Sequence, residues 1–191
     1  ARIFPRTDEA SGLARTALET AILRREAESK FPFASTLYLT RQALEQASSW
    51  EVSSYRARRY AGLRMAVDLG CSVGGDSLAL AQKVPLLGID RDALRLAMAR
   101  ANAAALELSE RLCFVQADLL RSLPVAAQGN DVALFFDPAR RTESKRTFSV
   151  RHYQPPLEVL RRWLERFPAL GVKISPGVDL AELSSYATEV E

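Results

Sequence analysis

The sequence has few of the residues from which metal centres and disulfide frameworks are built. Among its 191 residues are one histidine, His152, and two cysteines, Cys71 and Cys113. Two cysteines cannot supply a disulfide framework or a four-ligand zinc site, so we expect no metal and a reducing, cytoplasmic compartment. No apolar run approaches the ~18 residues of a membrane span, which predicts a soluble protein that does not act at a membrane.

Lysine is also scarce, because only four of the 26 basic residues are lysines and the others are arginines. Arginine makes planar, bidentate contacts to phosphate and stacks on bases, which favours a nucleic-acid partner. A GC-rich genome produces the same composition, and the net charge is only +3. We therefore use local clusters of arginine, and not the overall composition, to predict partners.

Two parts of the chain differ in hydrophobic pattern. Residues 1–62 have helical patterning and almost no strand signal, which predicts a helical extension that acts as a lid. In residues 63–191 short apolar runs alternate with helical segments, which predicts an α/β fold with a doubly wound, mostly parallel sheet. We expect this domain to be incomplete at its C-terminus, with further strands beyond Glu191. The predicted strands are 65–69, 86–90, 112–115, 131–136 and 172–175, and the main helices of this domain are 75–83, 92–106 and 156–167.

Acidic residues and glycines follow the first three predicted strands. An open parallel sheet binds ligands at the carboxyl ends of its strands. Asp68 precedes a turn with Gly70 and Gly74, where the absence of a Cβ lets the backbone approach a ligand. A carboxylate at this point repels a pyrophosphate but suits the ammonium and sulfonium of S-adenosylmethionine. Asp90 is placed to accept hydrogen bonds from ribose hydroxyls, and Asp118 to accept one from an adenine amine.

The order of these motifs resembles that of the class I S-adenosylmethionine-dependent methyltransferases. It consists of Val67-Asp68-Leu69-Gly70-Cys71, Gly88-Ile89-Asp90, Ala117-Asp118 and Phe136-Asp137-Pro138, within residues 65–191. The resemblance implies S-adenosyl-L-methionine as the cofactor. It assigns cofactor binding to Asp68, Gly70, Cys71, Ser72, Gly74, Asp90, Arg91, Asp118 and Leu119. Ser72 departs from the family pattern, because it replaces the middle glycine of D-x-G-x-G-x-G.

The segment after the fourth predicted strand resembles the [DNS]-P-P-[YFW] motif of enzymes that methylate base nitrogens. We expect the Asp137 carboxylate and the Pro138 carbonyl to accept the hydrogens of an amine and direct its lone pair at the methyl group. Ala139 and Arg140 replace the second proline and the aromatic residue. Arg140 and Arg141 are therefore predicted to bind the substrate, by stacking on a base or contacting a phosphate. Alternatively, they pair with acidic residues and shape the loop.

More specifically, the segments 53–59, 137–141 and 173–177 resemble a group of bacterial methyltransferases that carry a THUMP-like domain, distantly similar to trimethylguanosine synthase. This resemblance implies RNA as the partner and guanine N2 as the methyl acceptor. Two alternatives stay open: an N-methyltransferase for small molecules or proteins, and a cofactor-binding or RNA-binding module without turnover. Asp68 and the glycine spacing disfavour a dinucleotide-dependent oxidoreductase. The sequence makes no prediction of the oligomeric state.

Overall fold

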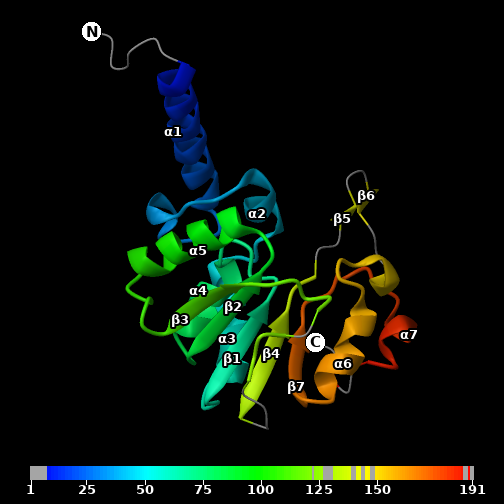
Figure 1. The fold of residues 1–191 in the computed structure, drawn as a ribbon. Helices are drawn as coiled ribbons and strands as arrows, with labels where there is room; N and C mark the ends of the chain where they lie inside the picture. Colours follow the sequence, from blue (N-terminus) through cyan, green and yellow to red (C-terminus); the bar gives the residue numbers. More distant parts are fainter. Residues whose placement is uncertain are drawn as a thin grey trace.

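Five parallel strands form the central sheet of the computed structural model (Figure 1). The structure describes residues 8–121, 123–126, 131–138, 141–142, 145–146, 149–186 and 189. The strand order is β3-β2-β1-β4-β7, so the direction of winding reverses between β1 and β4. The predicted doubly wound sheet is thereby confirmed. Its strands are β1 (Met65–Leu69), β2 (Leu86–Asp90), β3 (Leu112–Gln116), β4 (Val132–Phe136) and β7 (Ala169–Val172).

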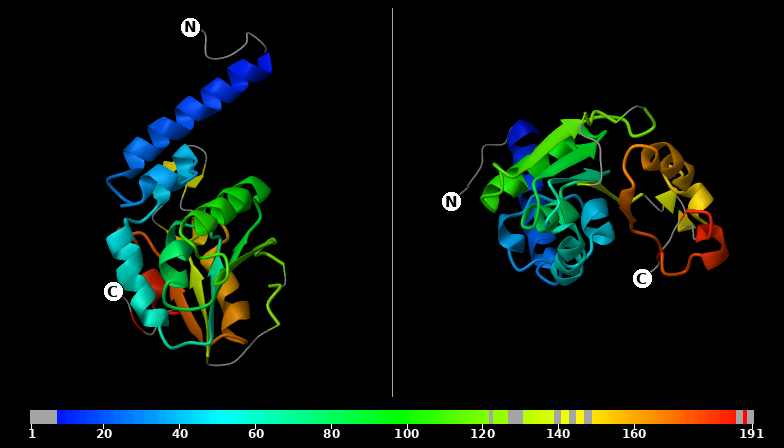
Figure 2. Two further views of the ribbon diagram at one scale, coloured as in Figure 1. Left: turned by 90° about the vertical axis from the view of Figure 1, so that its left-hand side faces the viewer. Right: turned by 90° about the horizontal axis from the view of Figure 1, so that it is seen from below.

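Helices cover both faces of this sheet (Figures 1 and 2). On one face lie α4 (Gly75–Ala81), α5 (Ala93–Ala105) and the N-terminal helices, and on the other lie α6 (Leu160–Leu164) and α7 (Leu180–Leu183). Short 3₁₀ segments and one hairpin complete the described elements. These are η1 (Ala34–Thr36), η2 (Arg58–Tyr60), η3 (Val150–His152), η4 (Leu157–Val159), β5 (Arg141–Thr142) and β6 (Lys145–Arg146).

The N-terminal extension consists of α1 (Asp8–Ala27), α2 (Arg41–Gln46) and α3 (Trp50–Ala57). Most of α1 projects beyond the rest of the molecule, whereas the following segments lie against the sheet domain (Figures 1 and 2). No helix in the described part of the chain, α1 included, is long and apolar enough to cross a membrane. The assignment of residues 1–62 as a lid stays a prediction.

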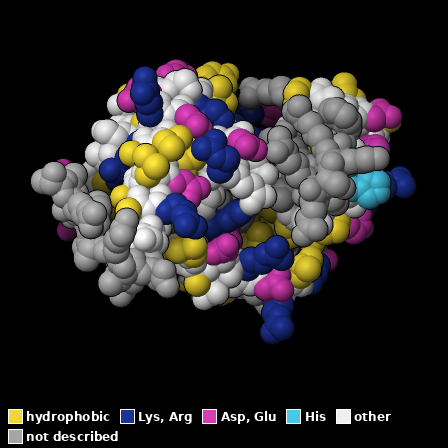
Figure 3. Space-filling model, turned by 90° about the horizontal axis from the view of Figure 1, so that it is seen from above, with side chains coloured by type: hydrophobic (Ala, Val, Ile, Leu, Met, Phe, Trp, Pro, Cys, Tyr) yellow, Lys and Arg dark blue, Asp and Glu magenta, His cyan; other side chains and the backbone are white. Residues whose placement is uncertain are grey.

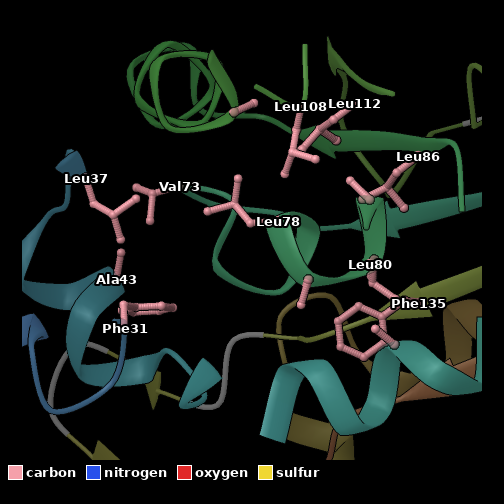
Figure 4. Close-up of a cluster of buried hydrophobic side chains, with 14 of the residues drawn as sticks. Phe31, Leu37, Ala43, Val73, Leu78, Leu80, Leu86, Leu108, Leu112 and Phe135 are labelled. Carbon is pink, nitrogen blue, oxygen red and sulfur yellow. The ribbon is translucent and has the colours of Figure 1, made fainter. Parts of the chain in front are cut away.

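The sheet has one hydrophobic core on each face. Successive side chains of a strand point to opposite faces, and β4 shows this, because Ala133 and Phe135 enter one core while Leu134 and Phe136 enter the other. The first core also contains Phe31, Leu37 and Ala43 of the extension, which lie across from Val73 and Leu78 (Figure 4). The extension and the sheet therefore share one core.

Two of the predicted elements have different bounds in the structure. The fifth strand occupies 169–172 and not 172–175, because Ala169–Val172 pairs with Ala133–Phe136. The Lys173 N–H donates to the Phe136 carbonyl at 2.9 Å, and this bond continues the pairing just past the strand. The helix predicted over 156–167 is divided into η4 and the shorter α6. Because β7 ends at Val172, Lys173 lies at the carboxyl edge of the sheet and not within a strand.

Candidate cofactor and active site

A cavity of about 780 Å³ lies at the carboxyl edge of the sheet. The residues at the ends of β1, β2 and β4 and those after β3 form its floor. The extension contributes Phe31 and residues of α2, and residues 151–156 form a further wall. Three parts of the chain that are far apart in sequence thus enclose one space.

The cavity brings together most of the predicted site residues. Those that line it are Asp68, Gly70, Cys71, Ser72, Asp90, Arg91, Asp118, Leu119, Asp137 and Pro138. Gly74 is not part of this lining. It precedes α4 in the left-handed conformation, with a φ of 89°, and packs against Ala99. Its contribution is therefore to the turn and not to a ligand contact.

The two predicted substrate-binding arginines are not placed by the structure. Arg140 lies outside the described residues. Arg141 is described only through its backbone, which pairs with Arg146 in the β5–β6 hairpin. Their contact with a substrate stays a prediction.

Asp68 is a buried carboxylic acid at the base of the cavity. Its exposed fraction is 2%, and its Oδ2 accepts a hydrogen bond of 2.5 Å from the Ser77 hydroxyl of α4. Burial raises the pKa of Asp68 to about 8, and the charges of Asp76, Asp137 and Asp90 act in the same direction. A cation placed in the cavity would stabilise the ionised form of this acid.

Asp90 is held in a fixed orientation by backbone groups on both sides. Its Oδ2 accepts the N–H of Ser72 at 2.8 Å, and its Oδ1 accepts the N–H of Asp92 at 2.9 Å. Ser72 adopts a left-handed conformation with a φ of 52°, at the position where the family pattern has glycine. Each carboxylate oxygen keeps lone pairs for a second hydrogen bond, so Asp90 is suited to accept from a pair of hydroxyls.

The remaining lining residues differ in exposure. Asp118 is exposed and its Oδ1 accepts the N–H of Leu120 at 2.9 Å, so a local turn orients it. Cys71 is buried, and this burial raises the pKa of its thiol well above the usual value. A protonated thiol is a poor nucleophile, so we assign Cys71 to the cavity wall.

The glycine turn and the end of β4 approach each other closely. Gly70 has a φ of 85°, and a Cβ at this position would lie 3.7 Å from the carbonyl oxygen of Asp137. A ligand that contacted the backbone of this turn would therefore lie close to Asp137 and Pro138. Asp68 and Asp90 line the same cavity, and this arrangement fits a ligand with a cationic centre, a ribose and an adenine, as in S-adenosylmethionine.

The structure also identifies charged residues at the site that the sequence analysis did not assign. Lys173 donates to Asp137 Oδ2 at 2.5 Å, and its Nζ lies 3.9 Å from Asp76 Oδ2. Asp76 also lines the cavity and pairs with Arg56 of α3. Lys173 was missed because the predicted strand ran through it, although its segment was noted in the family resemblance. Asp76 was missed because an acid in the first turn of a helix is common for reasons of helix stability alone.

Comparison with known proteins gives consistent results. Residues 66–150 match a family described as a methyltransferase domain. The chain is 39% identical over 183 residues to an uncharacterized S-adenosylmethionine-dependent methyltransferase of Mycobacterium tuberculosis, found in two strains. This match covers 91% of the chain but 48% of the relative, so the chain spans about half the length of the curated relatives that it matches.

The crystal structure of a putative methyltransferase from Porphyromonas gingivalis W83 has the same fold. The TM-score is 0.70, with 23% sequence identity, over 98% of this chain and 46% of the other. The fold, the matched residues and the acidic cavity at the carboxyl edge agree with each other. The chain is therefore similar to methyltransferase domains over residues 66–150, and its fold is that of the class I S-adenosylmethionine-dependent methyltransferases.

Proposed function

We propose that the protein methylates a base nitrogen of RNA, with guanine N2 as the acceptor. The observation that carries the proposal is the position of Asp137 and Pro138, which line the same cavity as Asp68 and Asp90. A ligand held by Asp68 and Asp90 and a base held at Asp137 would meet within this single space.

The acceptor chemistry follows from the groups at the end of β4. S-adenosylmethionine supplies an electrophilic methyl group on a positively charged sulfur. An exocyclic amine is a weak nucleophile because its lone pair is delocalised into the ring. The Asp137 carboxylate and the Pro138 carbonyl oxygen are acceptors that can bind its hydrogens and turn the lone pair toward the methyl group. As the C–N bond forms, the C–S bond breaks with its electron pair on sulfur, and the nitrogen loses one proton to the Asp137 carboxylate.

The distribution of charge supports a base inside the cavity and a phosphate chain outside it. Asp68, Asp76, Asp90 and Asp137 all line the cavity, which disfavours an anionic group there. Arg91 and Arg151 are exposed at the same cavity. Arg140 and Arg141 directly follow the Asp137-Pro138 segment in sequence. Arginines around an acidic cavity suit a nucleic acid that inserts one base and keeps its backbone at the surface.

The test is transfer of a labelled methyl group from S-adenosylmethionine to total bacterial RNA, followed by analysis of the modified nucleosides. We expect N2-methylguanosine, and a loss of about 100-fold or more in rate in Asp137→Ala, because alanine has no side-chain acceptor for the hydrogens of the amine. Asp131→Ala is the matched control, since Asp131 lies at the opposite edge of the sheet and pairs with Arg64. Unlabelled RNA, or equal labelling by the Asp137→Ala variant, would overturn the proposal.

A small amine substrate is a second candidate, favoured by the mixture of charges around the cavity. Lys and Arg side chains are interspersed with Asp and Glu side chains on the face seen from above, and no uniformly basic surface is visible there (Figure 3). RNA binding through phosphates predicts an affinity that falls steeply with salt concentration. Binding that is insensitive to salt would favour the small substrate.

A further inference from the structure

Lys173 lies directly behind the wall of the cavity, beside Asp137. It is the first residue after β7, and its N–H donates to the carbonyl of Phe136, the last residue of β4. This backbone pairing brings Lys173 next to Asp137, the first residue after β4. The Lys173 side chain is only 14% exposed, and its Nζ donates to Asp137 Oδ2 at 2.5 Å.

The Lys173 ammonium contacts three separate parts of the molecule. Besides Asp137, it lies 3.9 Å from Asp76 Oδ2 of α4 and donates to the Gln46 carbonyl of α2 at 3.4 Å. Asp76 Oδ1 in turn accepts hydrogen bonds from Ser53 and Arg56 of α3. A chain of polar contacts therefore runs from the end of β4 through Lys173 and Asp76 to the N-terminal extension.

Asp137 shares the cavity with several other acidic side chains, and the Lys173 ammonium offsets their effect on its ionisation. Several carboxylates share the cavity, and like charges in one site favour protonation of at least one of them. An adjacent ammonium has the opposite effect and favours the carboxylate form. Besides Asp137, the charged or titratable groups that line the cavity or pair with Asp76 and Asp137 in the described residues include Asp68, Asp76, Asp90, Asp118, Glu45, Arg56, Arg91, Arg95, Arg151, His152 and Lys173. Lys30 is a second cation close to Lys173, and its ammonium donates to the carbonyls of Leu44 and Ala47.

We propose that Lys173 is a positioning residue of this site, which holds Asp137 as an oriented carboxylate and connects it to the N-terminal extension. The Lys173 ammonium is directed at Asp137, Asp76 and the Gln46 carbonyl, so we assign it an effect through Asp137 and not on a ligand. The consequence for methyl transfer rests on the function proposed above, whereas the effect on Asp137 does not. A protonated Asp137 would have lost part of its capacity to accept the hydrogens of an amine.

Two substitutions separate the charge of Lys173 from its bulk. Lys173→Met removes the charge and keeps a similar length, and Lys173→Arg keeps the charge. Lys83→Met is the matched control, because Lys83 is exposed just after α4. If Lys173→Met alone is too unstable to study, the double variant Asp137→Asn/Lys173→Met removes both partners, and we expect its melting temperature to exceed that of the single variant.

The direct readout is the side-chain carboxyl ¹³C signal of Asp137 as a function of pH. We expect it to stay at the carboxylate position between about pH 5.5 and 8 in the wild type, in Lys173→Arg and in Lys83→Met. In Lys173→Met it is expected to titrate within that range. The Kd of S-adenosylhomocysteine should change by less than about threefold in all variants, since the predicted contacts to the adenosyl group are elsewhere.

The second readout is the rate of methyl transfer to RNA at saturating S-adenosylmethionine. We expect Lys173→Met to be slower by about 10- to 100-fold, with at least partial rescue in Lys173→Arg. An Asp137 signal that does not respond to Lys173→Met overturns the proposal, as does an unchanged transfer rate in an active enzyme. If the wild type transfers no methyl group to RNA, the proposed function fails, and the Asp137 signal alone decides the role of Lys173.

Discussion

At the scale of single residues, Asp68 is a buried acid in the lining of the cavity. Burial raises its pKa to about 8, so we expect the folded protein without ligand to hold a proton on this acid at neutral pH. In the unfolded chain the ordinary pKa is 3.8. The folded state therefore binds this proton more tightly than the unfolded chain does. As a result, the contribution of Asp68 to the free energy of unfolding decreases as the pH rises from about 4 to about 8.

The proton on Asp68 predicts how cofactor binding depends on pH. A ligand ammonium next to Asp68 favours the carboxylate, so binding expels the proton. We expect S-adenosylhomocysteine to release up to one proton per site at pH 7, with an affinity that rises between about pH 6 and 8 and levels off above. Calorimetry in buffers of different ionisation enthalpy measures this release. Asp68→Asn should bind more weakly and release no proton; the same release in this variant would assign the proton to another group.

The acidic residues of the site could be predicted from sequence because each one follows, or nearly ends, a strongly apolar run. Asp68, Asp90, Asp118 and Asp137 lie at the carboxyl edge for this reason, and their strands were assigned within a few residues. Lys173 could not be assigned in this way. Its neighbours Val172 and Ile174 continue the apolar pattern, so only the pairing with β4 shows where the strand ends.

At the scale of elements, the contact between β2 and β3 depends on Gly88. Gly88 pairs with Phe114, and a Cβ on Gly88 would lie 2.6 Å from the Phe114 ring and 3.1 Å from the Cys71 sulfur. We expect Gly88→Ala to lower the free energy of unfolding in urea by about 1–3 kcal/mol, because the ring must move. Gly12→Ala in α1 is the control, since no atom lies within 4 Å of its Cβ position. It should not lower stability, because alanine is the better helix former. If the Gly88→Ala variant unfolded at the same urea concentration as the wild type, the Phe114 ring would be free to move aside, and this prediction would be wrong.

The start of a helix could be predicted from the sequence where a side chain caps the helix. Asp92 accepts the N–H groups of Leu94 and Arg95 at 2.9 and 3.1 Å, and α5 begins directly after it, within one residue of the prediction. The helix predicted over 156–167 was wrong in length, because the chain there turns as a 3₁₀ segment before α6. An amphipathic pattern alone does not distinguish these two forms of helix.

At the scale of the whole molecule, the extension and the sheet domain are physically joined, although the sequence pattern separates them near residue 62. Phe31, which is 1% exposed, belongs to the core on one face of the sheet and also lines the cavity. Long-range packing of this kind leaves no periodic signal in the sequence. We therefore expect substitutions in the extension to affect the site, because the two share a core and the Lys173 ammonium contacts the Gln46 carbonyl.

The most direct test of the account is calorimetric titration of the protein with S-adenosylhomocysteine. We predict one binding site, a loss of affinity of about 10- to 100-fold in Asp90→Ala, and no change in Asp131→Ala at the opposite edge of the sheet. Asp90 has both oxygens oriented by backbone N–H groups, so its removal takes away a preformed acceptor for the ribose hydroxyls. Absence of binding, or equal binding by the wild type and Asp90→Ala, would contradict a methyl-donor site in this cavity.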